Sequence, residues 1–383
     1  MIQLRNLTLA RGSQPLVEDL SLQVHDGWRV GLVGANGSGK TSLLALLRGE
    51  LQPELGDCEL PTGWRIATVL QETPALPQAA IEYVLDGDEQ LRGVEHALTA
   101  AQAAHDGERI SLLHAELETV DGYAARARGA ALMAGLGFST DDLERAVAEF
   151  SGGWRMRLNL ARALVSRADL MLLDEPTTHL DLDAIVWLER WLAGFPGTLI
   201  IISHDREFLD GCVTHVAHIS ARSLKLYTGN YSAFEEMRAE RLSQAAASYA
   251  KQQERIAHLQ KFIDRFKAKA TTAKQAQSRV KALARMEKLA PVLTASDFQF
   301  EFREPASLPN PMLSFDGLVC GYGHTPIVSG VNRSVLAGQR IGILGANGQG
   351  KSTLVKTIAG ALPPLGGLMT AGKGLVIGYF EQQ

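Results

Sequence analysis

The sequence predicts an α/β fold that contains two related phosphate-binding units, and three features of the chain lead to this prediction. An apolar run at residues 30–33 leads into a glycine-rich loop at 34–41 and then into an apolar helical segment. This order of strand, loop and helix is that of a phosphate-binding loop. The same loop returns at 345–352, and the apolar run at 170–173 is typical of a strand buried on both faces of a parallel sheet.

The first loop supplies the groups that bound phosphates need. Its glycines let successive backbone N–H groups turn inward, and the helix that follows adds the positive end of its dipole. Lys40 offers a point charge to the phosphates, and Thr41 offers a hydroxyl to Mg²⁺. The loop consists of Gly34, Ala35, Asn36, Gly37, Ser38, Gly39, Lys40 and Thr41.

The second loop repeats the first at a constant offset of 311 residues, since 345 − 34 = 311. The same offset pairs Gln71 with Gln382 and places Tyr322 where the first copy has Arg11. A chance glycine-rich turn would explain one loop but not a repeat in register, so the chain holds a duplicated unit. The second loop consists of Gly345, Ala346, Asn347, Gly348, Gln349, Gly350, Lys351 and Ser352.

Composition places the chain among ordinary globular proteins. Its 383 residues predict two or three domains, and 46% hydrophobic with 21% charged residues is the usual balance. The three cysteines form no C-x-x-C pair, so neither a disulfide framework nor a zinc site is indicated, and a reducing cytosol fits. No apolar run approaches the ~18 residues of a membrane helix, and no signal-peptide pattern opens the chain. We therefore expect a cytoplasmic protein without a membrane segment.

Polar side chains follow two apolar runs. Asp174 and Glu175 end the run at 170–173, and His204 follows the run at 198–202. Ligands of open α/β sheets bind at the carboxyl ends of strands, and two adjacent acids repel each other unless a cation or a reaction uses them. A lone histidine after a strand is more often a core or surface group than a catalytic one. The triplet Ser151, Gly152 and Gly153, taken alone, is more often an N-cap with a glycine turn.

Two helical regions interrupt or follow the first unit. Apolar stripes between residues 82 and 138 predict a helical insertion at about 82–140. No glycine or proline occurs from 231 to 290, which predicts two antiparallel helices joined near Thr271 and Thr272, with Ser232 and Glu235 as a capping box.

The second helical region is strongly basic. From Lys261 to Lys288 it holds nine positive residues against two acids, a net charge of +7 in a chain of net charge −4. Such a segment fits a polyanionic partner, although a solvated helical face is the competing interpretation. The residues that we expect to contact RNA are Lys267, Lys269, Lys274, Arg279 and Lys281.

The chain resembles an ATP-binding cassette because five motifs occur in the cassette order. They are the phosphate loop, Gln71, the S-G-G triplet, L-L-D-E-P and the His204 segment. Two cassettes with D-E-P-T-T-H-L-D at 174–181 resemble the ABC-F family and its YheS-like branch. Two positions depart from the pattern. Thr178 stands where the family usually has asparagine, and Arg11 stands where cassettes commonly stack adenine on an aromatic ring. Base contact in the first site is then a guanidinium stack or is absent.

The resemblance implies ATP and Mg²⁺ as cofactors and assigns roles. Thr41, Asp174 and Gln71 would hold the metal in the first site, and Ser352 in the second. Glu175 would act as general base, Gln71 and His204 would sense the γ-phosphate, and Tyr322 and Gln382 would serve the second nucleotide. Each S-G-G triplet would face the phosphate loop of the opposite cassette. ABC-F proteins bring the linker between cassettes to tRNA on the ribosome, so the resemblance implies ribosome, tRNA and rRNA partners.

The predicted organisation is a first cassette at 1–232, a basic helical hairpin at 233–300 and the beginning of a second cassette at 311–383. The sequence contains no second S-G-G and no second L-L-D-E-P. We therefore expect either a truncated second cassette or pairing of first cassettes between two chains, with ATP binding but poor hydrolysis by one chain alone. Two other function classes fit the nucleotide motifs: the energy-coupling subunit of a membrane transporter, and a nucleic-acid repair ATPase.

Overall fold

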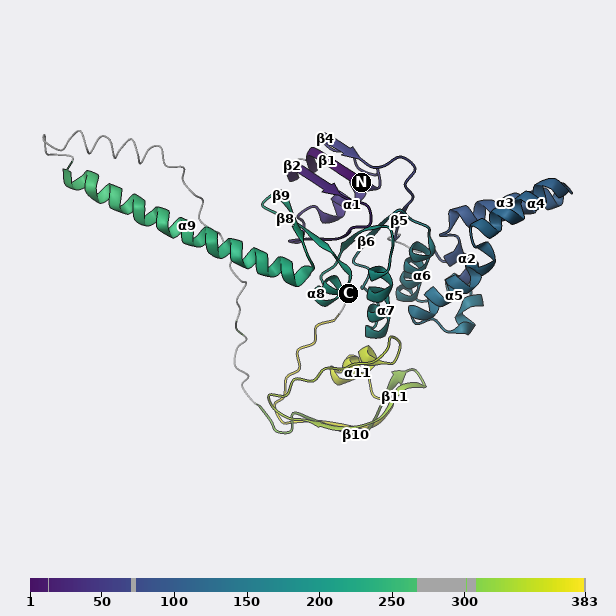
Figure 1. Ribbon diagram of the computed structural model, residues 1–383. Coiled ribbons are helices and arrows are strands. Elements are labelled where there is room, and N and C mark those ends of the chain that lie inside the picture. The colour runs from purple at the N-terminus through teal and green to yellow at the C-terminus, as the bar shows by residue number, and fades with distance from the viewer. Residues whose placement is uncertain (13, 70–73, 267–300, 302–307, 382–383) are drawn as a thin grey trace.

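The computed structural model describes residues 1–12, 14–69, 74–266, 301 and 308–381. Its largest element is a six-stranded sheet with strand order β5-β6-β7-β3-β8-β9 (Figure 1). All neighbours are parallel except the last pair. The strands are β3 (Arg29–Gly34), β5 (Ile66–Thr68), β6 (Leu170–Asp174), β7 (Thr198–Ile202), β8 (His215–Ser220) and β9 (Ser223–Thr228).

The register of this sheet brings the ends of its central strands level. Asp174, the last residue of β6, pairs with Ile202, the last residue of β7. The apolar residues of both strands are buried, as the run at 170–173 predicted. The predicted α/β class is confirmed, and the side chains that follow β6 and β7 emerge at one edge.

A smaller antiparallel sheet covers one face of the six-stranded sheet. It consists of β1 (Ile2–Arg11), β2 (Gln14–Val24) and β4 (Leu55–Glu59), in the order β2-β1-β4. Its inward residues form one apolar cluster with α1 (Lys40–Leu47) and with residues of β3, β6 and β7. This cluster fixes the helix that begins at the first phosphate loop.

Helices form a second layer and a projecting hairpin. Leu91 and Val94 on α3 and Leu113 and Leu117 on α4 are buried, so both predicted apolar stripes are found on helices. The α3–α4 hairpin extends away from the sheets (Figure 1). The helices are α2 (Ala80–Leu85), α3 (Glu89–Ala103), α4 (Gly107–Thr119), α5 (Ala125–Gly135), α6 (Gly152–Val165), α7 (Leu182–Ala193) and α8 (Arg206–Cys212), with 3₁₀ turns η1 (Gly122–Ala124), η2 (Thr140–Glu144) and η3 (Val147–Glu149).

The long helix α9 (Tyr231–Phe266) leaves the first unit and projects from it (Figure 1). The predicted capping box is wrong. The helix begins earlier than predicted, because Asn230 Oδ1 accepts a hydrogen bond from the Ala233 amide at 3.1 Å. Ser232 lies within the first turn and donates its hydroxyl to Asp210 at 2.7 Å, while Glu235 pairs with Arg206 at 3.1 Å. The predicted second helix lies outside the described residues.

The second unit repeats the small antiparallel sheet of the first. Strands β10 (Leu313–Tyr322), β11 (Thr325–Val335) and β12 (Gly366–Ala371) have the order β11-β10-β12, which matches β2-β1-β4 at the offset of 311 residues. Helix α11 (Lys351–Ile358) follows the second loop as α1 follows the first. Residues 340–345, the counterpart of β3, are not in a strand in this part of the structure.

Candidate functional site

The first phosphate loop joins β3 to α1. At Gly34 an added Cβ would lie 2.7 Å from the carbonyl oxygen of Ile219, so no larger residue fits there. Gly39 has φ +98° and precedes the helix directly, a conformation that glycine adopts without strain. The backbone conformation of the loop therefore requires the glycines at its two ends, Gly34 and Gly39.

Lys40 is held by the loop that it would assist. Its buried ammonium donates hydrogen bonds to the carbonyl oxygens of Gly34 at 2.9 Å and Ala35 at 3.1 Å. Ser38 Oγ is buried and makes no hydrogen bond with any residue that the structure describes. A buried hydroxyl without a partner costs free energy, and a bound phosphate oxygen would satisfy it.

A cavity of about 440 Å³ opens at this loop, at the carboxyl edge of the six-stranded sheet. It brings the side chains that follow β6 and β7 together with the loop. The lining residues are Arg11, Leu16, Asn36, Gly37, Gly39, Lys40, Thr41, Ser42, Asp174, Glu175, Ile202 and His204.

Glu175 and His204 meet in this cavity. Glu175 has φ +49°, and its amide donates to the Ile202 carbonyl at 2.9 Å, which turns its side chain toward the loop. Its Oε2 accepts a hydrogen bond from the His204 amide at 3.3 Å. His204 Nε2 lies 3.5 Å from Glu175 Oε1, yet Oε1 is buried and accepts no hydrogen bond from the described residues. One carboxylate oxygen is therefore free to accept a proton.

The donor set fits a nucleoside triphosphate with Mg²⁺. Backbone amides and Lys40 suit phosphate oxygens, and the Thr41 hydroxyl with the Asp174 carboxylate offers the oxygen ligands that Mg²⁺ prefers. Gln71, predicted as a further ligand, lies outside the described residues, and so does Gln382.

The S-G-G triplet lies elsewhere. Ser151 is the N-cap residue of α6, and none of Ser151, Gly152 and Gly153 lines the first cavity. A Cβ added to Gly153 would lie 3.7 Å from Cβ of His179, in the segment that follows Glu175. The triplet and this segment are thus neighbours.

The second loop has the same internal geometry as the first. Lys351 donates to the Gly345 carbonyl at 2.5 Å and to the Ala346 carbonyl at 2.8 Å. In the same loop, the side-chain amide of Asn347 donates a hydrogen bond to the His179 carbonyl at 2.8 Å. The second loop therefore lies against the first unit, beside the segment that contacts Gly153.

The remaining predicted residues are less constrained. Tyr322 ends β10 with its ring exposed, whereas Arg11, at the matching position, lines the first cavity. The five predicted RNA contacts at 267–281 lie outside the described residues. Sequence reasoning missed Arg157 and Asp181. The available signals were an arginine one turn after the S-G-G triplet and an aspartate, the N-cap residue of α7, five residues after Pro176.

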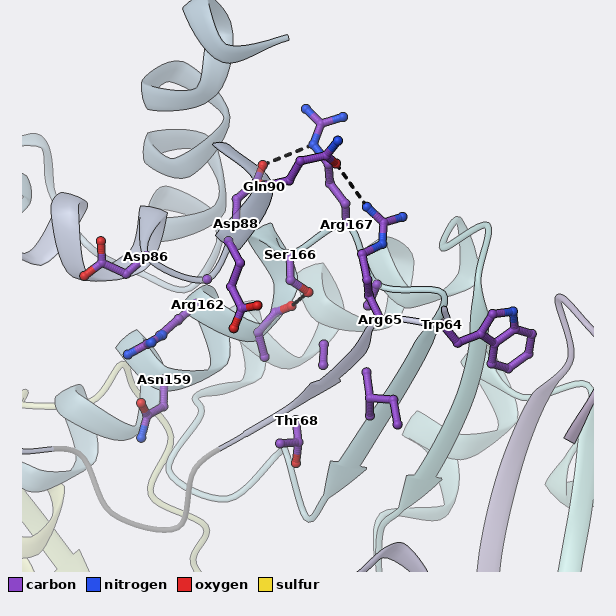
Figure 2. Close-up of a pocket in the computed structure, with 16 residues that line it drawn as sticks. Trp64, Arg65, Thr68, Asp86, Asp88, Gln90, Asn159, Arg162, Ser166 and Arg167 are labelled. Carbon is purple, nitrogen blue, oxygen red and sulfur yellow. Dashed lines mark hydrogen bonds and ion pairs between the residues drawn. The ribbon is translucent and has the colours of Figure 1, made fainter. Parts of the chain in front are cut away.

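A second cavity, also of about 440 Å³, lies where β5 begins, between α6 and the turn that joins α2 to α3 (Figure 2). Two of its three arginines are paired with acids, and the third, Arg162, lies over the ring of Tyr83. Arg65 contacts Asp169 at 3.1 Å, and Arg167 contacts the buried Asp88 at 3.1 Å. It lies at the amino end of β5, away from both phosphate loops, so it does not compete as the nucleotide site.

Comparisons with known proteins agree with the geometry. Two family models, both described as "ABC transporter", match residues 17–178 with 328–376 and residues 217–302. The chain is 53% identical over 382 residues to "Probable ATP-binding protein YheS" of Escherichia coli (strain K12). The alignment covers 100% of this chain and 60% of that protein. Among the described residues, no helix combines the length and apolarity needed to cross a bilayer.

More distant relatives match over the whole chain as well. Identity is 35% over 390 residues to "Probable ATP-binding protein YbiT" of Escherichia coli O157:H7, covering 100% of this chain and 73% of that protein. Identity is 37% over 391 residues to "ATP-binding cassette sub-family F member 3" of Homo sapiens, covering 100% of this chain and 54% of that protein. The chain thus spans 60% of the length of the YheS relative.

Proposed function

The chain belongs to the ABC-F family of ATP-binding cassette proteins, and on that premise we propose that it is a cytoplasmic ATPase that acts on the ribosome as a translation factor. The observation that carries the enzymatic part is the meeting of Glu175 and His204 with Lys40 in one cavity. The basic linker carries the ribosomal part.

In the first site, the loop amides and Lys40 would hold the phosphates, while Thr41 and Asp174, with Gln71, would hold Mg²⁺. A bound Mg²⁺ would supply neutralisation of the charge that develops on the phosphate oxygens. Each protein group named here, apart from Gln71, lines the cavity. The site thus binds and orients ATP before any proton moves.

Glu175 accepts a proton from the attacking water at Oε1, the oxygen that has no other hydrogen bond. Since its Oε2 already accepts from the His204 amide, the carboxylate is held in one orientation. His204, whose Nε2 lies 3.5 Å from Glu175 Oε1, would contact the γ-phosphate and stabilise charge there. General-base catalysis of this kind contributes roughly 10²- to 10⁴-fold.

The second loop binds a second ATP with Lys351, Ser352 and Gln382, and Tyr322 stacks on its base. Its contact with His179, beside Gly153, supports a composite site in which Ser151, Gly152 and Gly153 serve this nucleotide from the amino end of α6. A second copy of the chain could pair its first cassette in the same way.

The linker approaches tRNA or rRNA through the phosphate backbone. Helix α9 projects from the first unit (Figure 1), and the segment from Lys261 to Lys288, which begins in its last turns, has a net charge of +7. Lys and Arg side chains neutralise phosphates and release counterions, and A-form RNA is met mainly through its backbone and shape. ATP binding would then reposition this helical linker.

Co-sedimentation with ribosomes tests the proposal. We expect the triple change Lys267→Glu, Lys269→Glu and Lys274→Glu to abolish binding that the parent chain shows at low salt. The matched control reverses three lysines on the two units: Lys225→Glu, Lys356→Glu and Lys373→Glu. Equal loss in both variants, or none in the first, would contradict a linker contact.

Two parallel binding assays, with duplex DNA and with membrane vesicles, separate the alternative functions. Preferential binding to duplex DNA over ribosomes would favour the repair ATPase, and recruitment to vesicles containing a membrane partner would favour the transporter subunit. A steep loss of ribosome binding as salt rises is expected from counterion release.

A further inference from the structure

The β1–β2 hairpin forms one wall of the first cavity. Arg11 ends β1 and pairs across the turn with Gln14. Leu16 on β2 lies against the phosphate loop, because a Cβ added to Gly39 would be 3.0 Å from Leu16 Cβ. Arg11 and Leu16 are the lining residues that this hairpin contributes, and the others come from the phosphate loop, α1 and the ends of β6 and β7. This wall carries none of the phosphate or metal groups, so it is the part of the cavity left for the base of the nucleotide.

The second unit has the same hairpin with a different side chain at the same place. Tyr322 ends β10 at the position that matches Arg11, and each pairs with the residue three positions later. A Cβ added to Gly350 would be 2.7 Å from Cγ2 of Ile327, the counterpart of Leu16 at the offset of 311 residues. Both hairpins therefore lie against the last glycine of their phosphate loops, and the residue at the base-binding position is arginine in one unit and tyrosine in the other.

The guanidinium of Arg11 is available to a ligand. The side chain is exposed, and its guanidinium makes no hydrogen bond or ion pair with any residue that the structure describes. Lys40, which also lines the cavity, instead donates to two carbonyl oxygens of the phosphate loop. The donors of Arg11 are thus free to select what binds at this wall.

The two purines offer different groups to an arginine. A guanidinium has five N–H donors and no acceptor. Guanine presents O6 and N7, two adjacent acceptors that an arginine binds together, whereas adenine presents the N7 acceptor beside the N6 amino donor. A tyrosine ring instead stacks on either purine, because every base has a π-face. Arginine therefore favours guanine, and tyrosine distinguishes the two purines much less.

We propose that Arg11 determines base selectivity in the first site: it makes this site accept GTP as well as ATP, with GTP bound more tightly, whereas the second loop with Tyr322 lacks this preference. This inference rests on the proposed nucleotide binding at the first loop and extends it by naming the class of base. A guanidinium that bound a phosphate instead would strengthen the binding of both nucleotides equally. The ratio of the two affinities therefore separates base recognition from simple charge attraction.

The test measures the ratio of GTP to ATP affinity at the first loop. Unmodified nucleotides are titrated by calorimetry into the full chain carrying Lys351→Ala, which silences the second loop, and Glu175→Gln, which slows hydrolysis. We expect GTP to bind about 2- to 12-fold more tightly than ATP, the range that one additional net hydrogen bond provides. Arg11→Tyr should abolish this difference, and Arg11→Lys, which lacks the planar pair of donors, should reduce it.

Two controls identify the group that is recognised. Inosine triphosphate keeps the O6 and N7 acceptors of guanine but lacks its 2-amino group, so it should bind like GTP and lose its advantage in Arg11→Tyr. The reciprocal change Tyr322→Arg, placed in a chain carrying Lys40→Ala, should give the second loop a preference for GTP. Both altered side chains are exposed, so neither change removes a buried contact.

Three results would overturn the proposal. Equal affinities for GTP and ATP in the starting chain would show that Arg11 selects no base. A preference for GTP that persists in Arg11→Tyr would assign the selectivity to another residue, and an equal loss of both nucleotides would assign the arginine to a phosphate. Absence of all nucleotide binding to the Lys351→Ala chain would instead refute the proposed first site, a result distinct from binding without base preference.

Discussion

The two phosphate loops have the same internal geometry in very different surroundings. In each, the lysine donates to the first two carbonyl groups of the loop, and the last glycine has a left-handed φ of +98° or +86°. The segments that precede them, β3 in the first unit and residues 340–345 in the second, differ sharply in exposure. Leu32 is 1% and Val33 is 8% exposed, whereas their counterparts Ile343 and Leu344 are 38% and 91% exposed.

This difference separates binding from catalysis. The loop conformation is encoded locally by glycines and lysine, so it forms in both units. The carboxylate and the imidazole come from β6 and β7, so among the described residues only the first loop is joined by Glu175 and His204. The second loop meets the His179 carbonyl instead. We therefore propose that the loop conformation, which both units share, provides phosphate binding, and that hydrolysis requires the side chains at the carboxyl edge of the six-stranded sheet.

The largest expected effect is on hydrolysis at the first loop. Glu175→Gln keeps the shape of the side chain but removes the proton acceptor, so ATP turnover should fall about 10²- to 10⁴-fold while ATP affinity is retained. Phosphate release and analogue titration measure the two quantities. The control is Glu207→Gln on α8, away from the cavity lining. Unchanged turnover in Glu175→Gln would place the base elsewhere.

The next largest effect is on stability, at the segments that precede the two loops: β3 in the first unit and residues 340–345 in the second. Leu32→Ala should lower the free energy of unfolding by about 2–5 kcal/mol because it leaves a cavity in a packed sheet. The matched change Ile343→Ala should cost about 1 kcal/mol or less. Urea unfolding measures both. Equal losses would show that the segment before the second loop is as well packed as β3.

The two lysines allow a direct comparison of the loops. Lys40→Ala and Lys351→Ala each remove charged hydrogen bonds to phosphate, so each should weaken nucleotide binding at its own loop by about 10- to 150-fold. Turnover should be lost only with Lys40→Ala if the chemistry belongs to the first loop. Equal loss of turnover in both variants would argue for catalysis shared between the loops.

A smaller effect of pH should also distinguish the units. Burial, with the nearby charges of Arg238 and Lys225, lowers the pKa of His218, which packs on Phe234 at the root of α9. Folding favours its neutral form, so the unfolded chain binds more protons as the pH falls. The free energy of unfolding of the first unit should therefore drop between about pH 7.5 and pH 5.5. His218→Phe should flatten this slope, and an unchanged slope would contradict the assignment.

The residues at the site were predictable wherever a local pattern and a general rule coincided. Lys40 could be placed by its loop, and Asp174, Glu175 and His204 could be placed at one edge because parallel strands end together. The strand order β5-β6-β7-β3-β8-β9 was not predictable, since it depends on packing between distant segments. The Asn230 cap was missed because an alternative cap lay two residues further on.

The contacts of Arg157 were hidden for a similar reason. Its acceptors His179 and Asp181 lie 22 and 24 residues away, and its relation to Asn347 spans two units. The hydrophobic periodicity of a single segment does not predict contacts between residues that lie far apart in the sequence. Residues that bridge elements therefore need the structure, whereas residues within one motif do not.

We propose that ATP occupies the cavity between the first phosphate loop and the carboxyl edge of the six-stranded sheet. Photolabelling with 8-azido-ATP in a Lys351→Ala chain, followed by peptide mass spectrometry, tests it directly. We expect the label on the peptide that contains Arg11 and Leu16, which line this cavity. A label confined to the peptides around Arg65 and Arg167, at the cavity of Figure 2, would contradict the claim.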